Sequence, residues 1–315
     1  MNWTATAVAL LQVLIATLVA PLVIGITRQT RARLEGRVGA GILQPWRDLR
    51  KLLRKETLQA NGVSWISSIG PIVVMASSLL VAALLPLIST LTLPFVPDDL
   101  FVVVSVLLIG TVAVALIGLD VGSAFGGMGS SRHMMIAALV EPTVLVAVYA
   151  LSIPAGSSLL SSIVATRLDA PAVILSPVSL LAVVALFVAV LAETGRLPVD
   201  NPSTHLELTM VHEAMILESS GRDLAWLELG SWLRLSALLG LVANLMIPWG
   251  LATDATVLAL VVGTIALLLK LTVFAAALGA GEVFLAKLRL FRVPELLAGS
   301  FVLAFLAVTA SYLVT

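Results

Sequence analysis

The sequence contains no cysteine and only three histidines among its 315 residues. Without cysteine the chain cannot form disulfides, thiolate zinc sites, cysteine-ligated iron–sulfur clusters or a thiol nucleophile. Three histidines leave little room for a haem or for a site rich in metal ions. We therefore expect no metal site in this chain.

Charged residues are also scarce. They make up 11% of the chain, whereas soluble domains carry roughly 25%. Hydrophobic residues make up 60%, and the mean hydropathy is +1.11, so too few charges are present to cover a water-soluble surface. Length alone would suggest about two soluble domains, but this composition predicts one integral membrane domain over residues 1–315. The net charge of zero excludes a strongly basic nucleic-acid binder.

Long apolar runs are plentiful. A hydrocarbon core of ~30 Å requires ~20 apolar residues in a helix, and eight runs of about this length predict an all-α integral membrane protein with about eight transmembrane helices. The first run follows a segment without positive charge and is too long for a signal peptide, so we expect a retained helix. The runs span residues 4–26, 70–92, 100–119, 134–153, 172–192, 229–248, 255–281 and 295–314.

Basic residues are concentrated in alternate loops. The segments 27–56, 120–133, 193–234 and 282–294 hold 16 of the 18 Lys and Arg residues. The opposite loops contain only Arg167, and Lys270 lies inside the seventh run. The positive-inside rule then places the long loops in the cytoplasm and both termini outside.

The basic loop 27–56 contains a short helical pattern. Pro45 suits the first turn, and a basic stripe lies opposite an apolar one, which predicts an amphipathic helix. Two interpretations stay open, binding to anionic lipid at the bilayer surface or docking of a soluble partner. The nearby glycines are not followed by Gly-Lys-Ser/Thr, which argues against nucleotide binding. The basic stripe comprises Arg47, Arg50, Lys51, Arg54 and Lys55.

The segment 193–228 is rich in acidic residues. Asn201 can cap a helix that starts at Pro202, and Gly221 can end it, which predicts a helix of about 19 residues. His205 and His212 would lie ~10.5 Å apart along it, too far for one metal ion without other ligands. The helix is either solvated or, because many of its residues are apolar, held between the membrane domain and a partner.

Some ionisable residues lie inside or at the ends of the apolar runs, and we single out Glu141, Glu193, Lys270 and Glu282. Such residues are costly in lipid and normally face the protein interior. Pro142 follows Glu141 and donates no hydrogen bond to the carbonyl of Ala138, which predicts a polar spot and a kink. A structural Glu–Lys pair is one explanation; we favour proton or ion transfer because several such groups occur beside an acidic loop.

Two segments carry a resemblance to a known family. ETGRLPVDNPSTHLELTMVHEAMILESSGR, residues 193–222, closely resembles a loop in the membrane subunit of group 4 NiFe-hydrogenases, of the formate hydrogenlyase and hydrogenase-4 component C type. That subunit is related to the quinone-site membrane subunit of respiratory complex I (the NADH dehydrogenase subunit 1 family). GRVGAGILQPWRDLRKLLRKE, residues 36–56, resembles the glycine-rich segment and following helix of the same subunit. The resemblance covers essentially the whole chain.

The resemblance implies a non-catalytic subunit of an oxidoreductase complex in a prokaryotic inner membrane. Such a subunit anchors a hydrogenase-like large subunit and an iron–sulfur subunit, and begins an ion route toward antiporter-like membrane subunits. The NiFe centre and iron–sulfur clusters would then lie in partner chains, and none in this one. The match to the complex I version is weaker over 193–222, which argues against a quinone, although a quinone-reactive subunit stays an alternative.

The resemblance also implies roles for individual residues. The proton-accessible set would be Glu141, Glu193, Glu207, Glu213 and Glu218, to which burial adds Lys270 and Glu282. Partner docking would involve Arg37, Arg47, Arg50, Lys51, Arg54, Arg196, Asp200, His205 and His212. Two further alternatives stay open. One is a stand-alone transporter, although the sequence shows no internal repeat of the kind such transporters have. The other is a passive membrane anchor.

Overall fold

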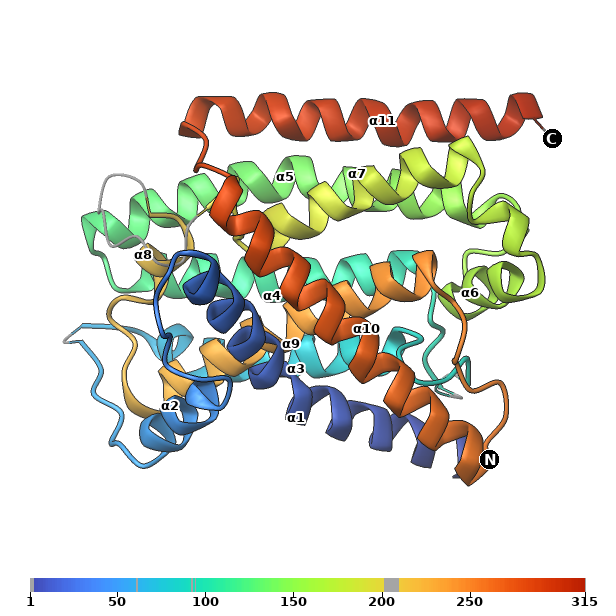
Figure 1. The fold of residues 1–315 in the computed structure, drawn as a ribbon. Coiled ribbons are helices and arrows are strands. Elements are labelled where there is room, and N and C mark those ends of the chain that lie inside the picture. Colours follow the sequence, from blue (N-terminus) through green and yellow to red (C-terminus); the bar gives the residue numbers. More distant parts are fainter. Residues whose placement is uncertain (1–2, 61, 92, 94, 201–209, 315) are drawn as a thin grey trace.

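A computed structural model describes residues 3–60, 62–91, 93, 95–200 and 210–314. Within these residues all regular structure is helical and no β-strand forms (Figure 1). Each of the eight predicted apolar runs forms a helix: α1 (Trp3–Leu34), α3 (Trp65–Leu84), α4 (Leu100–Asp120), α5 (Ala124–Ser152), α7 (Pro177–Glu193), α9 (Gly221–Met246), α10 (Val257–Phe284) and α11 (Val293–Val314). The predicted all-α membrane fold is confirmed.

Seven of these helices are long and apolar enough to cross a membrane, and α7 is the shorter one. Its 17 residues span only about 25 Å at 1.5 Å per residue. Pro177 stands in its first turn, and the preceding residues form the 3₁₀ turn η1 (Pro171–Val173) in place of more α-helix. Gly195, with a φ of +59°, follows its last residues. The chain is a multi-pass membrane protein.

Both termini lie at one end of the helix bundle, and the long connections lie at the other (Figure 1). The end opposite the termini carries α2 (Gln44–Leu53) and α8 (His212–Ile216). The end with the termini carries the short α6 (Leu160–Asp169). This arrangement agrees with termini on one side and long loops on the other; which side faces the cytoplasm stays a prediction.

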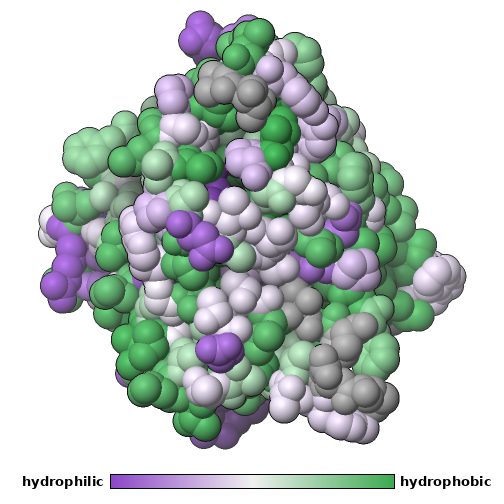
Figure 2. Space-filling model, turned by 90° about the vertical axis from the view of Figure 1, so that its right-hand side faces the viewer, coloured by the Kyte–Doolittle hydropathy of each residue, from purple (hydrophilic) through white to green (hydrophobic). Residues whose placement is uncertain are grey.

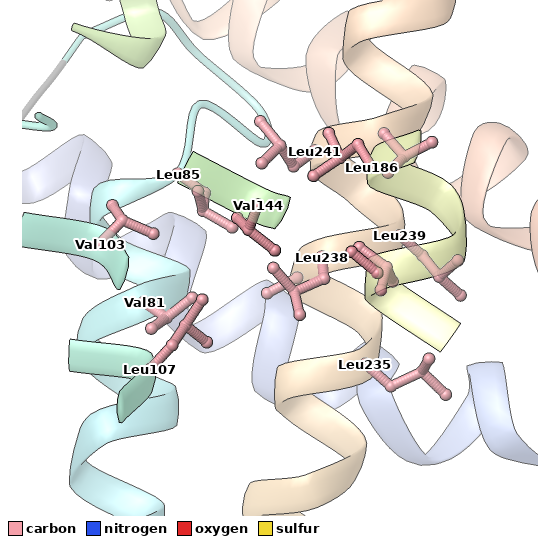
Figure 3. Close-up of a cluster of buried hydrophobic side chains, with 14 of the residues drawn as sticks. Val81, Leu85, Val103, Leu107, Val144, Leu186, Leu235, Leu238, Leu239 and Leu241 are labelled. Carbon is pink, nitrogen blue, oxygen red and sulfur yellow. The ribbon is translucent and has the colours of Figure 1, made fainter. Parts of the chain in front are cut away.

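Helix α9 is the centre of the bundle. It packs against α1, α3, α7 and α10, and its residues from Trp232 to Leu245 are buried without interruption. Figure 3 shows Leu235, Leu238, Leu239 and Leu241 of α9 among valines and leucines of α3, α4, α5 and α7. Any polar residue on this stretch of α9 must therefore find its partners inside the protein.

Helices α10 and α11 lie at the periphery. Many of their apolar side chains are exposed, including Leu258, Ile265 and Leu269 on α10 and Phe305 on α11. Figure 2 looks onto the end that carries the termini, where purple and pale residues occupy the middle and green hydrophobic residues surround them. An apolar circumference around a polar end is the surface expected of a bundle that crosses a bilayer.

The helix predicted over 202–220 differs from the structure. Residues 201–209 lie outside the described residues, and residues 210–220 contain only the five-residue helix α8. Gly221 begins α9 and does not end a helix. It has a φ of +54°, and a Cβ added there would lie 2.3 Å from the carbonyl oxygen of Glu56. The glycine is therefore explained by a close backbone approach at the start of α9.

Two arginines counted as loop residues in the sequence belong to helices. Arg132 lies in α5, because that helix begins at Ala124 and leaves only a short turn after α4. Arg234 lies in the middle of α9 and is 8% exposed. The assignment of Arg234 to the basic side of the membrane was therefore wrong: the helix starts earlier than its apolar stretch, so the residue is carried into the bundle.

The amphipathic helix predicted in the basic loop is confirmed as α2. Pro45 stands in its first turn, Leu49 is buried, and the predicted basic stripe is exposed. The glycine-rich turn before it is held by Gln29 of α1, whose side chain donates to the carbonyl of Val38 and accepts from the backbone N–H of Gly41. The loop is thus a fixed part of the surface at this end of the bundle. The 3₁₀ turn η2 (Leu290–Arg292) precedes α11.

Candidate functional site

A cavity of about 430 Å³ opens between the end of α1, the glycine-rich turn, the 194–200 segment, α8, α9 and the end of α10. It lies within the size range of ligand sites, but its walls are unusually rich in charge. A space lined in this way favours water and ions over an apolar ligand. Its ionisable lining residues are Arg28, Arg31, Arg37, Arg196, Asp200, His212, Glu213, Glu228 and Glu282. We call it the loop cavity.

Two ion pairs fix the segment that follows α7. Arg196 Nη1 lies 3.3 Å from Glu282 Oε1 of α10, and Arg31 Nη1 of α1 lies 3.7 Å from the other oxygen of the same carboxylate. Lys287 Nζ lies 2.6 Å from Asp200 Oδ1. Of the predicted site residues, Arg196, Asp200 and Glu282 are therefore brought together here, buried and internally paired.

Two titratable residues of α8 face the loop cavity. Burial raises the pKa of Glu213 to about 7, with the neighbouring carboxylates Glu228 and Asp200 adding to the effect and Arg28 opposing it. Burial lowers the pKa of His212, Asp200 opposes that shift, and Arg234 and Arg196 add to it. Glu213 can therefore accept or release a proton near pH 7, and His212 is held in its neutral form.

Deeper in the bundle lies a buried ion pair between Glu193 and Arg234. Arg234 Nη1 donates to Glu193 Oε1 at 2.9 Å and to the hydroxyl of Thr111 at 2.9 Å, and its Nη2 donates to the carbonyl of Leu107. The hydroxyl of Thr111 also donates to Glu193 Oε1, at 3.1 Å. We call Glu193, Arg234 and Thr111 the buried cluster. It joins α7, α9 and α4.

The space for Arg234 is made by Gly110 on α4. A Cβ at that position would lie 2.2 Å from Arg234 Nη2 and 2.5 Å from the hydroxyl of Ser77. A buried guanidinium costs several kcal/mol of desolvation unless it is paired and hydrogen-bonded. The sequence meets this requirement with a glycine at the point of closest approach and acceptors from two neighbouring helices.

A small cavity of about 40 Å³ lies next to both sites. Glu193 and Arg234 line it from the buried cluster, and Thr194, His212 and Ser231 line both this cavity and the loop cavity. About 10–15 Å³ suffices for one water molecule when polar groups surround it. The residues around the two cavities therefore form an ionisable path, with room for water, from the loop end of the molecule into the bundle.

Glu141 lies beside this path. Its Oε1 is buried without a hydrogen-bond partner among the described residues, and it interacts electrostatically with Glu193 and Arg234. Pro142 stands inside α5, as predicted, directly after this carboxyl. A buried polar atom without a partner in a helix bundle is rare and requires a reason. The structure thus places Glu141 and Glu193 in one neighbourhood.

Lys270 is buried in the middle of α10, where it donates to Asn244 Oδ1 of α9 at 2.9 Å. The amide nitrogen of Asn244 donates in turn to the carbonyls of Pro86 and Leu87, just beyond α3. Within the described part of the chain Lys270 has no carboxylate partner, so the alternative of a structural Glu–Lys pair receives no support there. Asn244 lies ten residues from Arg234, or about 15 Å along α9.

The remaining predicted residues lie elsewhere. Glu207 and His205 lie outside the described residues. Glu218 is exposed after α8 and lines a separate depression with Asp223, so it does not join the loop cavity. Arg37 lines the cavity rim and pairs with Glu35. The docking residues on α2 and at its end are exposed: Arg47, Arg50, Lys51 and Arg54.

Sequence reasoning missed several residues of these sites, among them Arg28, Arg31, Thr111, His133, Glu228 and Arg234. Arg28 lies 5.8 Å from the ring centroid of Trp232, within the range of a cation–π interaction. Arg234 had a visible signal, since it stands in the apolar stretch SWLRLSALLG. His133, Arg28 and Glu228 had none, because only the packing of helices brings them to the cavities. No group of three or more potential metal ligands occurs among the described residues.

Fold and site together define a class of membrane protein: a multi-pass helix bundle with a buried ion pair at its centre and a charged cavity at its loop end. The chain belongs to the NADH dehydrogenase family, whose sequence profile matches residues 6–313. It is 33% identical to formate hydrogenlyase subunit 4 of Escherichia coli (strain K12) over 299 residues, covering 95% of this chain and 96% of that protein. This similarity confirms the resemblance carried by segments 36–56 and 193–222.

Two further relatives extend the comparison. Hydrogenase-4 component C of the same organism is 31% identical over 303 residues, covering 95% of this chain and 93% of that protein. An NADH-quinone oxidoreductase subunit of Syntrophobacter fumaroxidans is 31% identical over 271 residues, covering 78% of this chain and 79% of that protein. A chain in the structure of the membrane-bound sulfane sulfur reductase, an archaeal respiratory membrane complex, shares the fold with a TM-score of 0.85 and 19% identity over 98% of this chain and 99% of that one.

Proposed function

We propose that this chain is the membrane-anchoring and ion-coupling subunit of a large complex of the hydrogenase or formate hydrogenlyase type. It docks a soluble redox arm at its loop end and links electron transfer there to ion translocation through the bundle. A hydrogenase-like large subunit carrying a NiFe centre and a subunit carrying iron–sulfur clusters are the expected peripheral partners, and antiporter-like subunits the expected membrane partners. Relatives named as subunits of formate hydrogenlyase and hydrogenase-4 support this assignment.

The observation that carries the coupling role is that the loop cavity, the small cavity and the buried cluster adjoin one another. The two cavities share three lining residues, and the inner one ends on the Glu193–Arg234 pair. A passive anchor would not require an ion pair in its centre, where well-packed apolar residues are often at least as stabilising. A change of charge or conformation at the loop cavity can therefore alter the protonation of groups deep in the bundle.

The coupling role is tested with Glu141→Gln and Lys270→Ala in the intact complex, reconstituted in liposomes. Hydrogen evolution from a reduced viologen dye is recorded together with ion movement across the membrane. Both variants should assemble but move fewer ions per electron pair. Assembly with full coupling in both variants would favour the passive anchor.

Docking is tested at the basic face of α2. Reversal of Arg47, Arg50 and Lys51 to Glu should release the soluble arm from membranes at moderate salt, because these side chains are exposed and free to pair across an interface. The matched control reverses Arg289 and Arg292, which lie outside α2. Retention of the arm in the α2 variant would leave lipid binding as the function of this helix.

A quinone-reactive subunit is the second candidate, and the volume of the loop cavity favours it, since 430 Å³ can hold a ring of that size. The lining counts against it, because small-molecule sites are usually apolar with few polar groups, and nine ionisable side chains line this one. The test adds membrane quinone to the purified complex and places a bulky side chain at Ala40, which lines the loop cavity. Quinone-dependent turnover that this substitution blocks would favour the quinone-reactive subunit over the ion-coupling subunit.

A further inference from the structure

The three residues shared by the two cavities differ in their capacity to carry a proton. The hydroxyl of Thr194 donates to the carbonyl of Val190 at 2.7 Å, and that of Ser231 donates to the carbonyl of Glu228 at 2.9 Å. Both hydroxyl protons are therefore engaged with helix backbone. The ring of His212 makes no hydrogen bond within the described part of the chain, and it is the one titratable group of the three.

The position of His212 is set by the packing of α8. Gly118 of α4 and Gly129 of α5 leave room for this short helix, because a Cβ at either position would lie within 3.2 Å of Met215. The backbone N–H of His212 donates to Asp200 Oδ2 at 3.1 Å, and Lys287 holds the other oxygen of that carboxylate. Asp200 thus anchors the start of α8 and keeps the ring between the two cavities.

The chemistry of imidazole suits this position. A neutral ring accepts a proton on one nitrogen and can release the proton held on the other, so it passes a proton from one side to the opposite side. Burial lowers the pKa of His212, so the ring rests neutral with a nitrogen free to accept. His212 and Glu193 both line the small cavity, which has space for water.

We propose that His212 passes protons between the loop cavity and the buried cluster. One ring nitrogen takes a proton from water in the loop cavity, and the other releases its proton to water in the small cavity. That water protonates the carboxylate of Glu193, and the ring returns to its first tautomer. This inference rests on the proposed coupling function and names the residue through which the path must run.

The test compares four variants in the reconstituted complex, with Glu193→Gln as the reference for loss of coupling. His212→Ala should lower the initial rate of proton movement by ~100-fold, a typical contribution of general acid–base groups, while hydrogen evolution from reduced viologen in detergent persists. His212→Gln should be equally slow, because an amide keeps a polar side chain at this position but cannot carry the proton. Free imidazole should restore His212→Ala, since the loop cavity admits it.

His133→Ala is the matched control for imidazole. His133 lines the small cavity but not the loop cavity, so added imidazole should not restore any loss in that variant. Assembly of each variant is checked by co-purification of the partner subunits. This control separates entry through the loop cavity from a general effect of imidazole on the membrane.

Each outcome decides between the two claims. Loss of coupling in Glu193→Gln together with wild-type rates in His212→Ala would overturn the inference and leave the proposed function intact. Full activity of His212→Gln, or failure of imidazole to restore His212→Ala, would show that the histidine only supports packing and would also overturn the inference. Wild-type coupling in Glu193→Gln would overturn the proposed function, and the inference with it.

Discussion

Arg234→Met tests whether the buried cluster is an ion pair on which the bundle depends. The substitution keeps an apolar stem of similar length but leaves the Glu193 carboxylate, which is 8% exposed, without its counter-charge. Removal of one partner of a buried pair costs about 3–5 kcal/mol. Replacement of both partners, in Glu193→Gln with Arg234→Met, should restore most of that loss, because no uncompensated charge remains.

The absence of native cysteine makes this measurable within the assembled complex. Ala237, one helical turn from Arg234 and 1% exposed, becomes the one thiol of this chain in an Ala237→Cys background, so its labelling is read on this subunit after the complex is separated. Labelling of a buried thiol reports the free energy of local opening. A loss of about 3 kcal/mol should accelerate labelling by about 100-fold in Arg234→Met, since about 1.36 kcal/mol corresponds to a factor of ten. Equal labelling rates in the single and double variants, or no acceleration in Arg234→Met, would refute the ion-pair argument.

Two more predictions follow from local geometry. Gly110→Ala should displace the Arg234 guanidinium and lower the melting temperature of the complex. The control is Gly127→Ala, whose added Cβ has nothing within 4 Å and which should be neutral or stabilise the helix by up to about 1 kcal/mol. Equal melting temperatures of the two variants would contradict the packing described for Gly110. The folded state raises the pKa of Glu213 to about 7 from 4.5, so its contribution to stability is complete below about pH 4.5 and is lost as the pH rises through 7. Glu213→Gln should therefore flatten the fall in melting temperature over that interval, and an unchanged profile would exclude Glu213 as its source.

The membrane fold could be predicted from the sequence because lipid imposes a simple rule on spanning segments. Each must be an apolar helix that satisfies its own backbone hydrogen bonds, so eight apolar runs sufficed to identify eight helices. Their ends were predicted less well. α9 begins eight residues before its expected start, because Arg222, Asp223 and Glu228 interrupt the apolar pattern without interrupting the helix.

Apart from residues that the resemblance supplied, such as Arg196, Asp200 and Glu213, the candidate site could be predicted only where one residue contradicts its surroundings. Glu141 and Lys270 stand out as charges in apolar runs, and both are found at polar positions within the bundle. The proximity of Glu193 to Arg234 could not be predicted, because it depends on how α7 and α9 pack, 41 residues apart in the chain. The same holds for His212, which reaches the small cavity only because glycines on α4 and α5 admit α8.

The central claim is that the Glu193–Arg234 cluster couples electron transfer in a docked arm to ion movement through this chain. The most direct measurement is the number of protons moved per electron pair by the intact complex in sealed liposomes, wild type against Glu193→Gln, with hydrogen evolution recorded in the same sample. Because Gln cannot be protonated at that position, the account predicts that hydrogen evolution continues while the proton count falls to the background of leaky liposomes. An assembled Glu193→Gln complex with the wild-type count would contradict it.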